Sequence, residues 1–183
     1  MGKLIAFIVL SFGFIYISRA SLRAPRSHGF YRFFAWEFIL ALFLLNMDHW
    51  FRNLLVWHQI VSWFLLVVSI LPLVFGVHSL ATRGKPVRHR QDDNYLLTFE
   101  KTTALVTTGL YQYIRHPIYS SLLLLTWGVF FKIPTWSGGL LALTATLFLV
   151  ATARADEAEC IRFFGSSYQE YMKHTKMFVP FLF

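Results

Sequence analysis

The chain has 183 residues and a formal net charge of +8, and 56% of its residues are hydrophobic while only 14% are charged. Because soluble globular domains carry about 25% charged residues, this composition excludes a soluble domain and predicts an integral membrane protein. The single cysteine, Cys160, excludes an internal disulfide framework and a thiol-based metal cluster.

Five apolar runs along the chain predict an all-α integral membrane protein with about five transmembrane helices. In chain order the runs cover residues 4–18, 33–47, 54–80, 118–131 and 136–153. The first run lacks a small-residue cleavage site, so we expect it to be retained and not removed as a signal peptide. Pro72 predicts a kink in the third run.

The only long hydrophilic stretch, residues 82–115, divides the chain into two predicted regions. Residues 1–81 form an N-terminal three-span membrane region. Residues 82–183 form a catalytic region with the loop, two spans and an amphipathic C-terminal tail, which we expect to fold back against the membrane surface. A loop of this length is usually functional or disordered.

The distribution of positive charge predicts the orientation in the membrane. Of the 17 Lys and Arg residues, only Lys3, Arg52 and Lys132 lie on the side of the N-terminus. By the positive-inside rule the long loop and the tail face the cytoplasm. We therefore expect a bacterial or archaeal inner membrane, or a eukaryotic endomembrane, with the site on the cytoplasmic side. The positive charge lies at the ends of apolar runs, which indicates membrane lipids and not nucleic acid as partners.

Chemistry-bearing residues concentrate in residues 105–119. Arg115 and His116 stand directly before Pro117, which is well tolerated at the first position of a helix and favours a non-helical residue before it. The two side chains would then lie at a helix N-terminus, where free N–H groups and the helix dipole favour an anion. The alternative is that Arg115 only anchors the helix end among lipid headgroups.

A second charged group follows the fifth run and contains Arg154, Asp156, Glu157 and Glu159. If the helix continues, Arg154 and Glu157 are neighbours at i, i+3. Sequential antiparallel helices place this group beside Arg115 and His116. The alternative is an ordinary charged helix end.

The two groups together carry a resemblance to a known family. The elements are Gly109-x-Tyr111-x-x-x-Arg115-His116-Pro117-x-Tyr119, the acidic pair Asp156-Glu157, and Phe164-Gly165-x-x-Tyr168-x-x-Tyr171. In that order they resemble the isoprenylcysteine carboxyl methyltransferase and phospholipid methyltransferase superfamily, over about residues 105–183. The sequence departs from the family pattern at Leu110, where many members have Pro, and at Ser121, where many have Gly.

The resemblance implies an integral membrane methyltransferase that uses S-adenosylmethionine. It implies a methyl acceptor that is lipophilic or membrane-associated, with a carboxylate, an amine or a thiol as the nucleophile at the cytosolic interface. The residues that it implies for cofactor binding are Gly109, Tyr111, Arg115, His116, Tyr119 and Glu157. Arg154 and Glu157 are the residues that it implies at the reacting group. The donor's carboxylate and ammonium suit an Arg/His pair and an acid respectively.

Several alternatives remain open on the sequence. His116 could be a general base instead of a cofactor ligand. A sterol-reductase-like enzyme that uses NADPH also carries an Arg-His-Pro-x-Tyr element, and a non-catalytic scaffold or transporter subunit is the alternative from another class. Glu37 lies inside a span, where an acid is costly, so it either has a function or pairs with Arg32. We expect no metal site.

Overall fold

The computed structural model describes residues 1–87, 96–97 and 100–180. Part of the predicted long loop, residues 88–95 and 98–99, lies outside the described residues. The described part is all-α, as predicted, and contains no β-strand. Its α-helices are α1 (Gly2–Leu22), α2 (His28–Asn46), α3 (Trp57–Arg83), α4 (Pro117–Phe130), α5 (Trp136–Phe164) and α6 (Ser166–His174), and two short 3₁₀ helices cover Met47–His49 and Gly109–Gln112.

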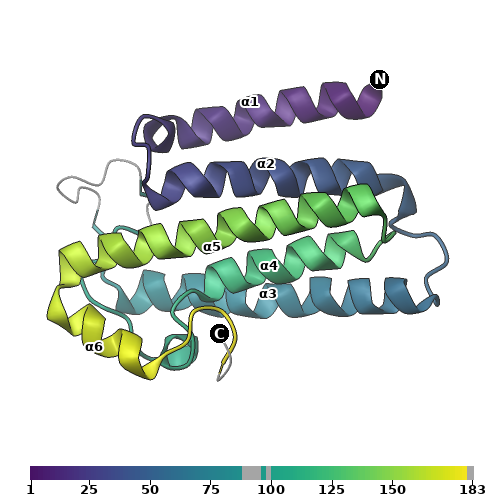
Figure 1. Ribbon diagram of the computed structural model, residues 1–183. Helices are drawn as coiled ribbons and strands as arrows, with labels where there is room; N and C mark the ends of the chain where they lie inside the picture. Colours follow the sequence, from purple (N-terminus) through teal and green to yellow (C-terminus); the bar gives the residue numbers. More distant parts are fainter. Residues whose placement is uncertain (88–95, 98–99, 181–183) are drawn as a thin grey trace.

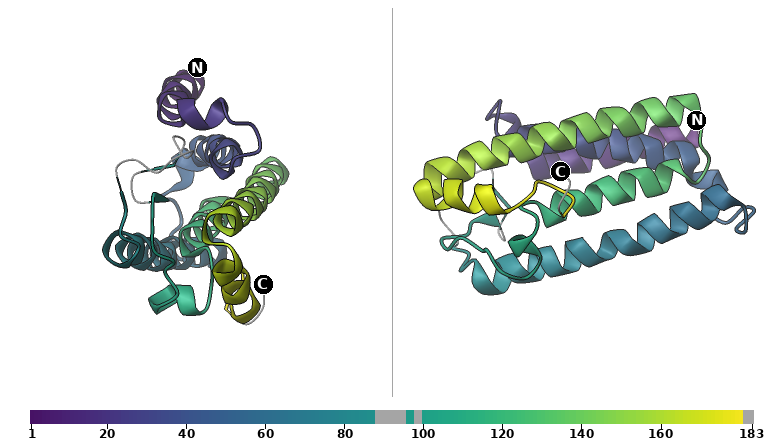
Figure 2. Two further views of the ribbon diagram at one scale, coloured as in Figure 1. Left: turned by 90° about the vertical axis from the view of Figure 1, so that its left-hand side faces the viewer. Right: turned by 60° about the horizontal axis from the view of Figure 1, so that its bottom comes forward.

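The five longer helices run antiparallel in chain order and form an elongated bundle (Figure 1). The most extensive interfaces join α2 to α5 and α3 to α4, while α1 lies on the outside and packs against α2 (Figure 2). One end of the bundle holds the N-terminus and the α2–α3 and α4–α5 connections. The other end holds the long loop, α6 and the C-terminal segment (Figure 1). The long loop and the tail, which were predicted to face the cytoplasm together, therefore lie at the same end of the bundle.

Four helices are long and apolar enough to cross a membrane, namely α1, α2, α3 and α5. The helix α4 is also apolar but has only 14 residues. At 1.5 Å per residue it reaches about 21 Å, less than the hydrocarbon thickness of about 30 Å. The count of about five predicted spans thus becomes four long helices and one short one, and α4 leaves room for non-helical chain at the end where Pro117 lies.

The helix α5 does not end near residue 153, where the sequence predicted the tail to begin, but continues to Phe164. The charged residues after Ala153 are compatible with a helix because Glu157 and Glu159 are buried against ionic partners. Gly165 then turns the chain with a φ of 62°, a conformation that suits glycine. The turn sends α6 back along the end of the bundle.

The C-terminal segment after α6 folds back onto the residues before α4. The backbone N–H of Arg115 donates to the carbonyl of Lys176 at 2.8 Å, and the N–H of His116 donates to that of Met177 at 3.2 Å. Tyr171 of α6 donates to the carbonyl of Tyr111 at 2.6 Å. The tail thus holds the Arg115-His116 segment in place. Its expected contact with the membrane surface stays a prediction.

Close helix packing places α3 beside the start of α4. A Cβ added to Gly76 of α3 would lie 3.0 Å from Cγ1 of Ile118 and 3.3 Å from Cβ of Pro117. A larger residue at position 76 would therefore push α3 away from the N-terminus of α4.

Pro72 lies inside α3, which continues through it as one helix from Trp57 to Arg83.

The opposite end of the bundle contains a fully buried lysine, Lys132, in the α4–α5 connection. Its ammonium lies 3.6 Å from the ring centroid of Trp63 and 5.0 Å from that of Trp50. It also donates to Oε1 of Gln59 at 3.2 Å. Cation–π contacts of a desolvated ammonium are worth about 2 kcal/mol, so this side chain fixes the α4–α5 connection against α3.

Candidate functional site

A cavity of about 100 Å³ lies at the end of the bundle that carries the long loop and the C-terminal segment. Apolar side chains from α3, the loop and α4 form one part of its lining, including Leu80, Val106 and Ile118. Titratable side chains form the other part: Glu100, Tyr111, Arg115, His116, Tyr119, Asp156, Glu159, Cys160, Tyr168 and Tyr171. The cavity therefore combines an apolar surface with a dense group of charges.

Arg115 lies on the cavity lining with its guanidinium partly engaged by the protein. Its Nε donates to Oε1 of Glu157 at 2.6 Å, and its Nη1 donates to the carbonyls of Met172, at 3.3 Å, and Thr175. Its Nη2 makes no hydrogen bond with the described residues. The guanidinium is thus oriented by Glu157 of α5, by α6 and by the segment after it, and the described contacts leave Nη2 available for an anion.

His116 is the residue before α4 and is buried between two acids. Its Nδ1 lies 3.4 Å from Oδ2 of Asp156, its Nε2 lies 3.3 Å from Oε1 of Glu157, and its ring stacks on Tyr119 with centroids 5.3 Å apart. Burial by itself lowers the pKa of His116, but Asp156 and Glu157 outweigh that effect and raise the pKa above the ordinary 6.5. A protonated imidazole is a donor from both nitrogens and is no base.

The structure brings most of the expected site residues together. Tyr111, Arg115, His116 and Tyr119 line the cavity. Glu157 does not line the cavity, but its carboxylate contacts the side chains of Arg115 and His116, which do.

Two expected residues stand apart from the cavity lining. Gly109 begins the 3₁₀ helix before Arg115 with a φ of 70°, and it contributes a turn that suits glycine. Arg154 is exposed on the side of α5 that also exposes Leu143 and Leu147. A cation at the end of a lipid-facing stripe is typical of headgroup contact.

The structure adds residues to the site that the sequence analysis did not select. Glu159 and Glu100 line the cavity beside Asp156. Arg32 of α2 forms an ion pair with Glu100, so it does not pair with Glu37, which instead accepts a hydrogen bond of 2.6 Å from Ser11.

The position of Glu159 could have been found from the sequence, since it lies three residues after Asp156 and shares its helix face. Nothing in the sequence pattern places Arg32 or Glu100 there. Ser121, at the family's glycine position, is buried and donates to the carbonyl of Ile118 at 2.6 Å within its own helix.

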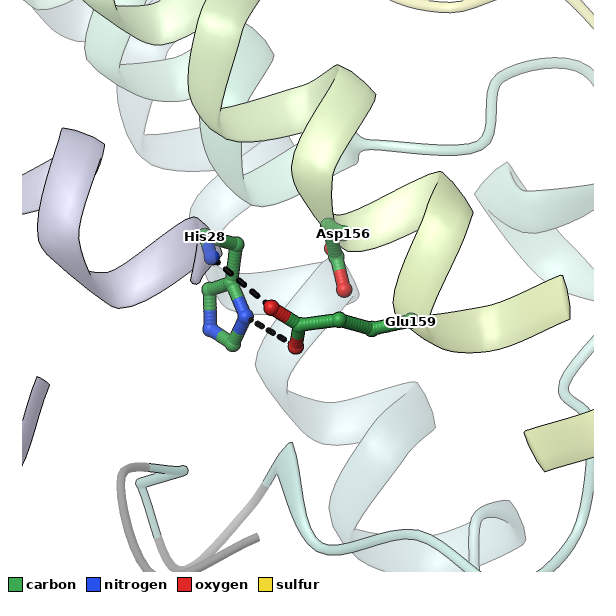
Figure 3. Close-up of side chains that lie close together, drawn as sticks. All are labelled: His28, Asp156 and Glu159. Atoms are coloured by element: carbon green, nitrogen blue, oxygen red, sulfur yellow. Dashed lines mark hydrogen bonds and ion pairs between the residues drawn. The ribbon is translucent and has the colours of Figure 1, made fainter. Parts of the chain in front are cut away.

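Figure 3 shows His28, Asp156 and Glu159 converging at the junction of α2 and α5. One potential ligand atom from each lies within 4.8 Å of the others. However, the ring of His28 already forms a hydrogen bond of 2.7 Å with Glu159, so a metal would have to displace it. The absence of a metal site stays a prediction.

Comparison with known proteins gives matches to methyltransferases. The phospholipid methyltransferase family model matches residues 88–170. A methanethiol S-methyltransferase from Pseudomonas deceptionensis is 32% identical over 78 residues, which are 42% of this chain and 28% of the relative. The protein-S-isoprenylcysteine O-methyltransferase of Schizosaccharomyces pombe is 31% identical over 83 residues, 45% of this chain and 35% of the relative.

A longer match is to a probable protein-S-isoprenylcysteine O-methyltransferase from Oryza sativa subsp. indica, 27% identical over 153 residues, 80% of this chain and 77% of the relative. By contrast, the matched segment spans less than a third of the methanethiol S-methyltransferase from Pseudomonas deceptionensis. No solved structure matches at the significance that these relatives reach. These matches support the predicted resemblance of the chain to the isoprenylcysteine carboxyl methyltransferase and phospholipid methyltransferase superfamily, which the family model places in residues 88–170.

Proposed function

We propose that this chain transfers a methyl group from S-adenosylmethionine to a lipophilic or membrane-associated acceptor at the cytosolic face of a membrane. The observation that carries the proposal is the cavity in which Arg115 and His116 face the carboxylates of Asp156 and Glu159 beside an apolar lining. The relatives named above act on methanethiol or on isoprenylcysteine, which supports methyl transfer and leaves a thiol, a carboxylate or an amine as the acceptor.

The donor set of the cavity fits the amino-acid end of S-adenosylmethionine. The Nη2 of Arg115 makes no hydrogen bond within the described part of the chain and His116 has a raised pKa, so both suit a carboxylate. Asp156 and Glu159 suit an ammonium. The cofactor itself supplies a methyl group activated by a sulfonium, so the protein needs neither a metal nor a covalent nucleophile for the transfer.

The residues of the chain would then orient the reactants and exclude water. Glu157 holds Arg115 and His116 in position, and the C-terminal segment closes over both through its backbone hydrogen bonds. The apolar lining at Leu80, Val106 and Ile118 suits a lipophilic acceptor that arrives from the bilayer. His116, as a protonated donor, acts in binding and not as the base.

Calorimetry of the detergent-purified chain with S-adenosylhomocysteine and with NADPH tests the proposal. We expect S-adenosylhomocysteine to bind and NADPH not to bind. Binding of NADPH alone would establish the reductase-like alternative, and binding of neither would favour the non-catalytic scaffold.

The single cysteine gives an independent measurement because Cys160 lines the cavity. We expect S-adenosylhomocysteine, and not NADPH, to slow alkylation of Cys160 in the native protein. An alkylation rate that neither ligand changes would place the binding site elsewhere.

A further inference from the structure

The first residue of α2, His28, contacts Glu159, one of the acids that line the cavity. The backbone N–H of His28 donates to Oε1 of Glu159 at 2.8 Å, and its ring Nδ1 donates to Oε2 of the same carboxylate at 2.7 Å (Figure 3). The side chain of His28 is only 1% exposed. Both oxygens of Glu159 are therefore held by one residue, and the orientation of this carboxylate is fixed by α2.

The other side of the His28 ring faces a second acid of the cavity. Its Nε2 lies 3.5 Å from Oε2 of Glu100. Glu100 also accepts a hydrogen bond of 2.9 Å from the backbone N–H of Leu97 and forms an ion pair with Arg32, one turn after His28 in α2. His28 thus stands between a carboxylate of α5 and a carboxylate of the loop.

Three acids line the cavity together, Glu100, Asp156 and Glu159, and we name them the carboxylate wall. The contacts of His28 and Arg32 hold two of them, Glu159 and Glu100. His28 and Arg32 lie outside residues 88–170, the segment that matches the family model. The N-terminal region therefore contributes to the cavity as well as to membrane anchoring.

We propose that His28 is a positioning residue of the site: through Nδ1 it sets the orientation of Glu159, and thereby the side of the carboxylate wall that meets the positive charge of the methyl donor. This inference rests on the proposed function. A carboxylate helps a cationic ligand only where its lone pairs point at the charge. Two hydrogen bonds from a buried residue remove the rotational freedom that would otherwise have to be lost on binding.

The two nitrogens of the ring can be separated by substitution. In His28→Asn the amide nitrogen falls near the position of Nδ1, so the bond to Glu159 is retained. In His28→Gln the amide nitrogen falls near Nε2, so the donor faces Glu100 instead. Both variants are neutral amides, and the backbone bond to Glu159 survives in each. A matched control is His58→Asn, because the Nδ1 of His58 contacts the carbonyl of Phe131 at the opposite end of the bundle.

The experiment measures the affinity for S-adenosylhomocysteine and for S-adenosylmethionine, kcat and KM, and the thermal midpoint of each purified variant. We expect His28→Asn to bind both ligands within about threefold of the wild type. We expect His28→Gln to lose about tenfold in affinity for both ligands, as for one charge-assisted hydrogen bond, because both carry the amino-acid ammonium that Glu159 would meet. His58→Asn should leave both affinities unchanged.

The outcomes separate positioning from folding. If the Asn and Gln variants lose affinity equally and in proportion to their thermal midpoints, His28 is a folding contact only and the inference fails. If both bind like the wild type, Nδ1 has no role and the inference also fails.

The alkylation rate of Cys160, which lines the same cavity, separates this inference from the proposed function. If the wild type binds neither ligand, the proposed function fails by itself. Positioning of the carboxylate wall is then still supported if Cys160 reacts faster in His28→Gln than in His28→Asn and the wild type. It is overturned if the three rates agree.

Discussion

The guanidinium of Arg115 and the carboxylate of Glu157 form an ion pair with Nε and Oε1 2.6 Å apart, although 42 positions separate the two residues in the chain. Arg115 precedes α4, and Glu157 lies in the last third of α5. The side chains are each about 10% exposed, so solvent screens the pair weakly. The pair joins the two helices at the cavity.

Arg115→Lys should weaken binding of S-adenosylhomocysteine about ten- to a hundredfold. Lysine keeps the charge but loses the planar fork that reaches Glu157 and an incoming carboxylate together. One hydrogen bond to a charged group is worth about 1.5–3 kcal/mol, which gives this range. Calorimetry on the purified variant measures it. The matched control is Arg162→Lys, at an exposed arginine of α5, which should bind as the wild type does.

Glu157→Gln should lower the same affinity, because the amide no longer holds Arg115 and His116 by charge. Arg115→Lys and Glu157→Gln both disrupt the same ion pair. The fold-loss of affinity in the double variant should therefore be smaller than the product of the two single fold-losses. Additive losses in a double-mutant cycle would mean that Glu157 acts independently of Arg115. Stable and fully active single variants would contradict the site as described.

The affinity of the wild type for S-adenosylhomocysteine should fall as the pH rises above 6.5 and through the raised pKa of His116. The ring is protonated below that pKa and donates to an anion, and it loses this ability above it. His116→Ala should bind about tenfold more weakly at pH 7 and show no such pH dependence. Binding that survives in this variant, with a turnover that falls, would instead identify His116 as the general base.

The same shift predicts a pH dependence of folding stability. The pKa of His116 is higher in the folded protein than its ordinary value of 6.5 in an unfolded chain. Its contribution to folding stability is therefore fully present at a pH below 6.5. That contribution is lost as the pH rises through the folded pKa. The thermal midpoint of the wild type should therefore approach that of His116→Ala with increasing pH. A difference that is constant with pH would contradict the assigned protonation.

Lys132 should give the opposite pH dependence, because desolvation lowers its pKa from 10.5 to about 8. Between these values the unfolded chain binds a proton that the folded chain has lost, so stability rises with pH across this interval. The gain relative to Lys132→Met should reach about 3 kcal/mol. Thermal midpoints of both proteins from pH 7 to pH 10.5 test it, and parallel curves would show that Lys132 keeps its proton.

The orientation predicted from the Lys and Arg distribution can be tested with single cysteines in a Cys160→Ser background. Ser167→Cys lies in α6 at the end with the cavity, and Leu55→Cys lies in the α2–α3 connection at the other end. Both positions are exposed. In intact cells a membrane-impermeant maleimide should label position 55 at once and position 167 only after permeabilisation. The reverse pattern would overturn the cytosolic placement of the site.

Removal of divalent metal should leave ligand binding unchanged. The convergence of His28, Asp156 and Glu159 is satisfied by a hydrogen bond between His28 and Glu159. Dialysis against EDTA should therefore alter the affinity for S-adenosylhomocysteine by less than about twofold, well below the loss of one hydrogen bond. A larger loss that added Zn²⁺ or Mn²⁺ restores would identify a metal site at these three residues.

The sequence by itself determined the class of the molecule, the approximate positions of the helices and the family. Apolar runs of helical length have few alternatives in a membrane, because every backbone polar group must be satisfied within the chain. The Arg115-His116-Pro117 element also indicated its own position, since Pro117 begins α4 as expected. The proximity of Arg115 to Glu157 followed from the antiparallel order of the last two long runs.

Only the tertiary structure decided which charges face the cavity. Helical spacing alone grouped Arg154 with Glu157, but the packing of α5 against α2 and α4 buries Glu157 and leaves Arg154 exposed. The pairing of His28 with Glu159 spans 131 positions, and no local pattern specifies a contact at that separation. Such contacts depend on how the helices rotate and pack, which is set by the sum of many side-chain interactions along the whole bundle.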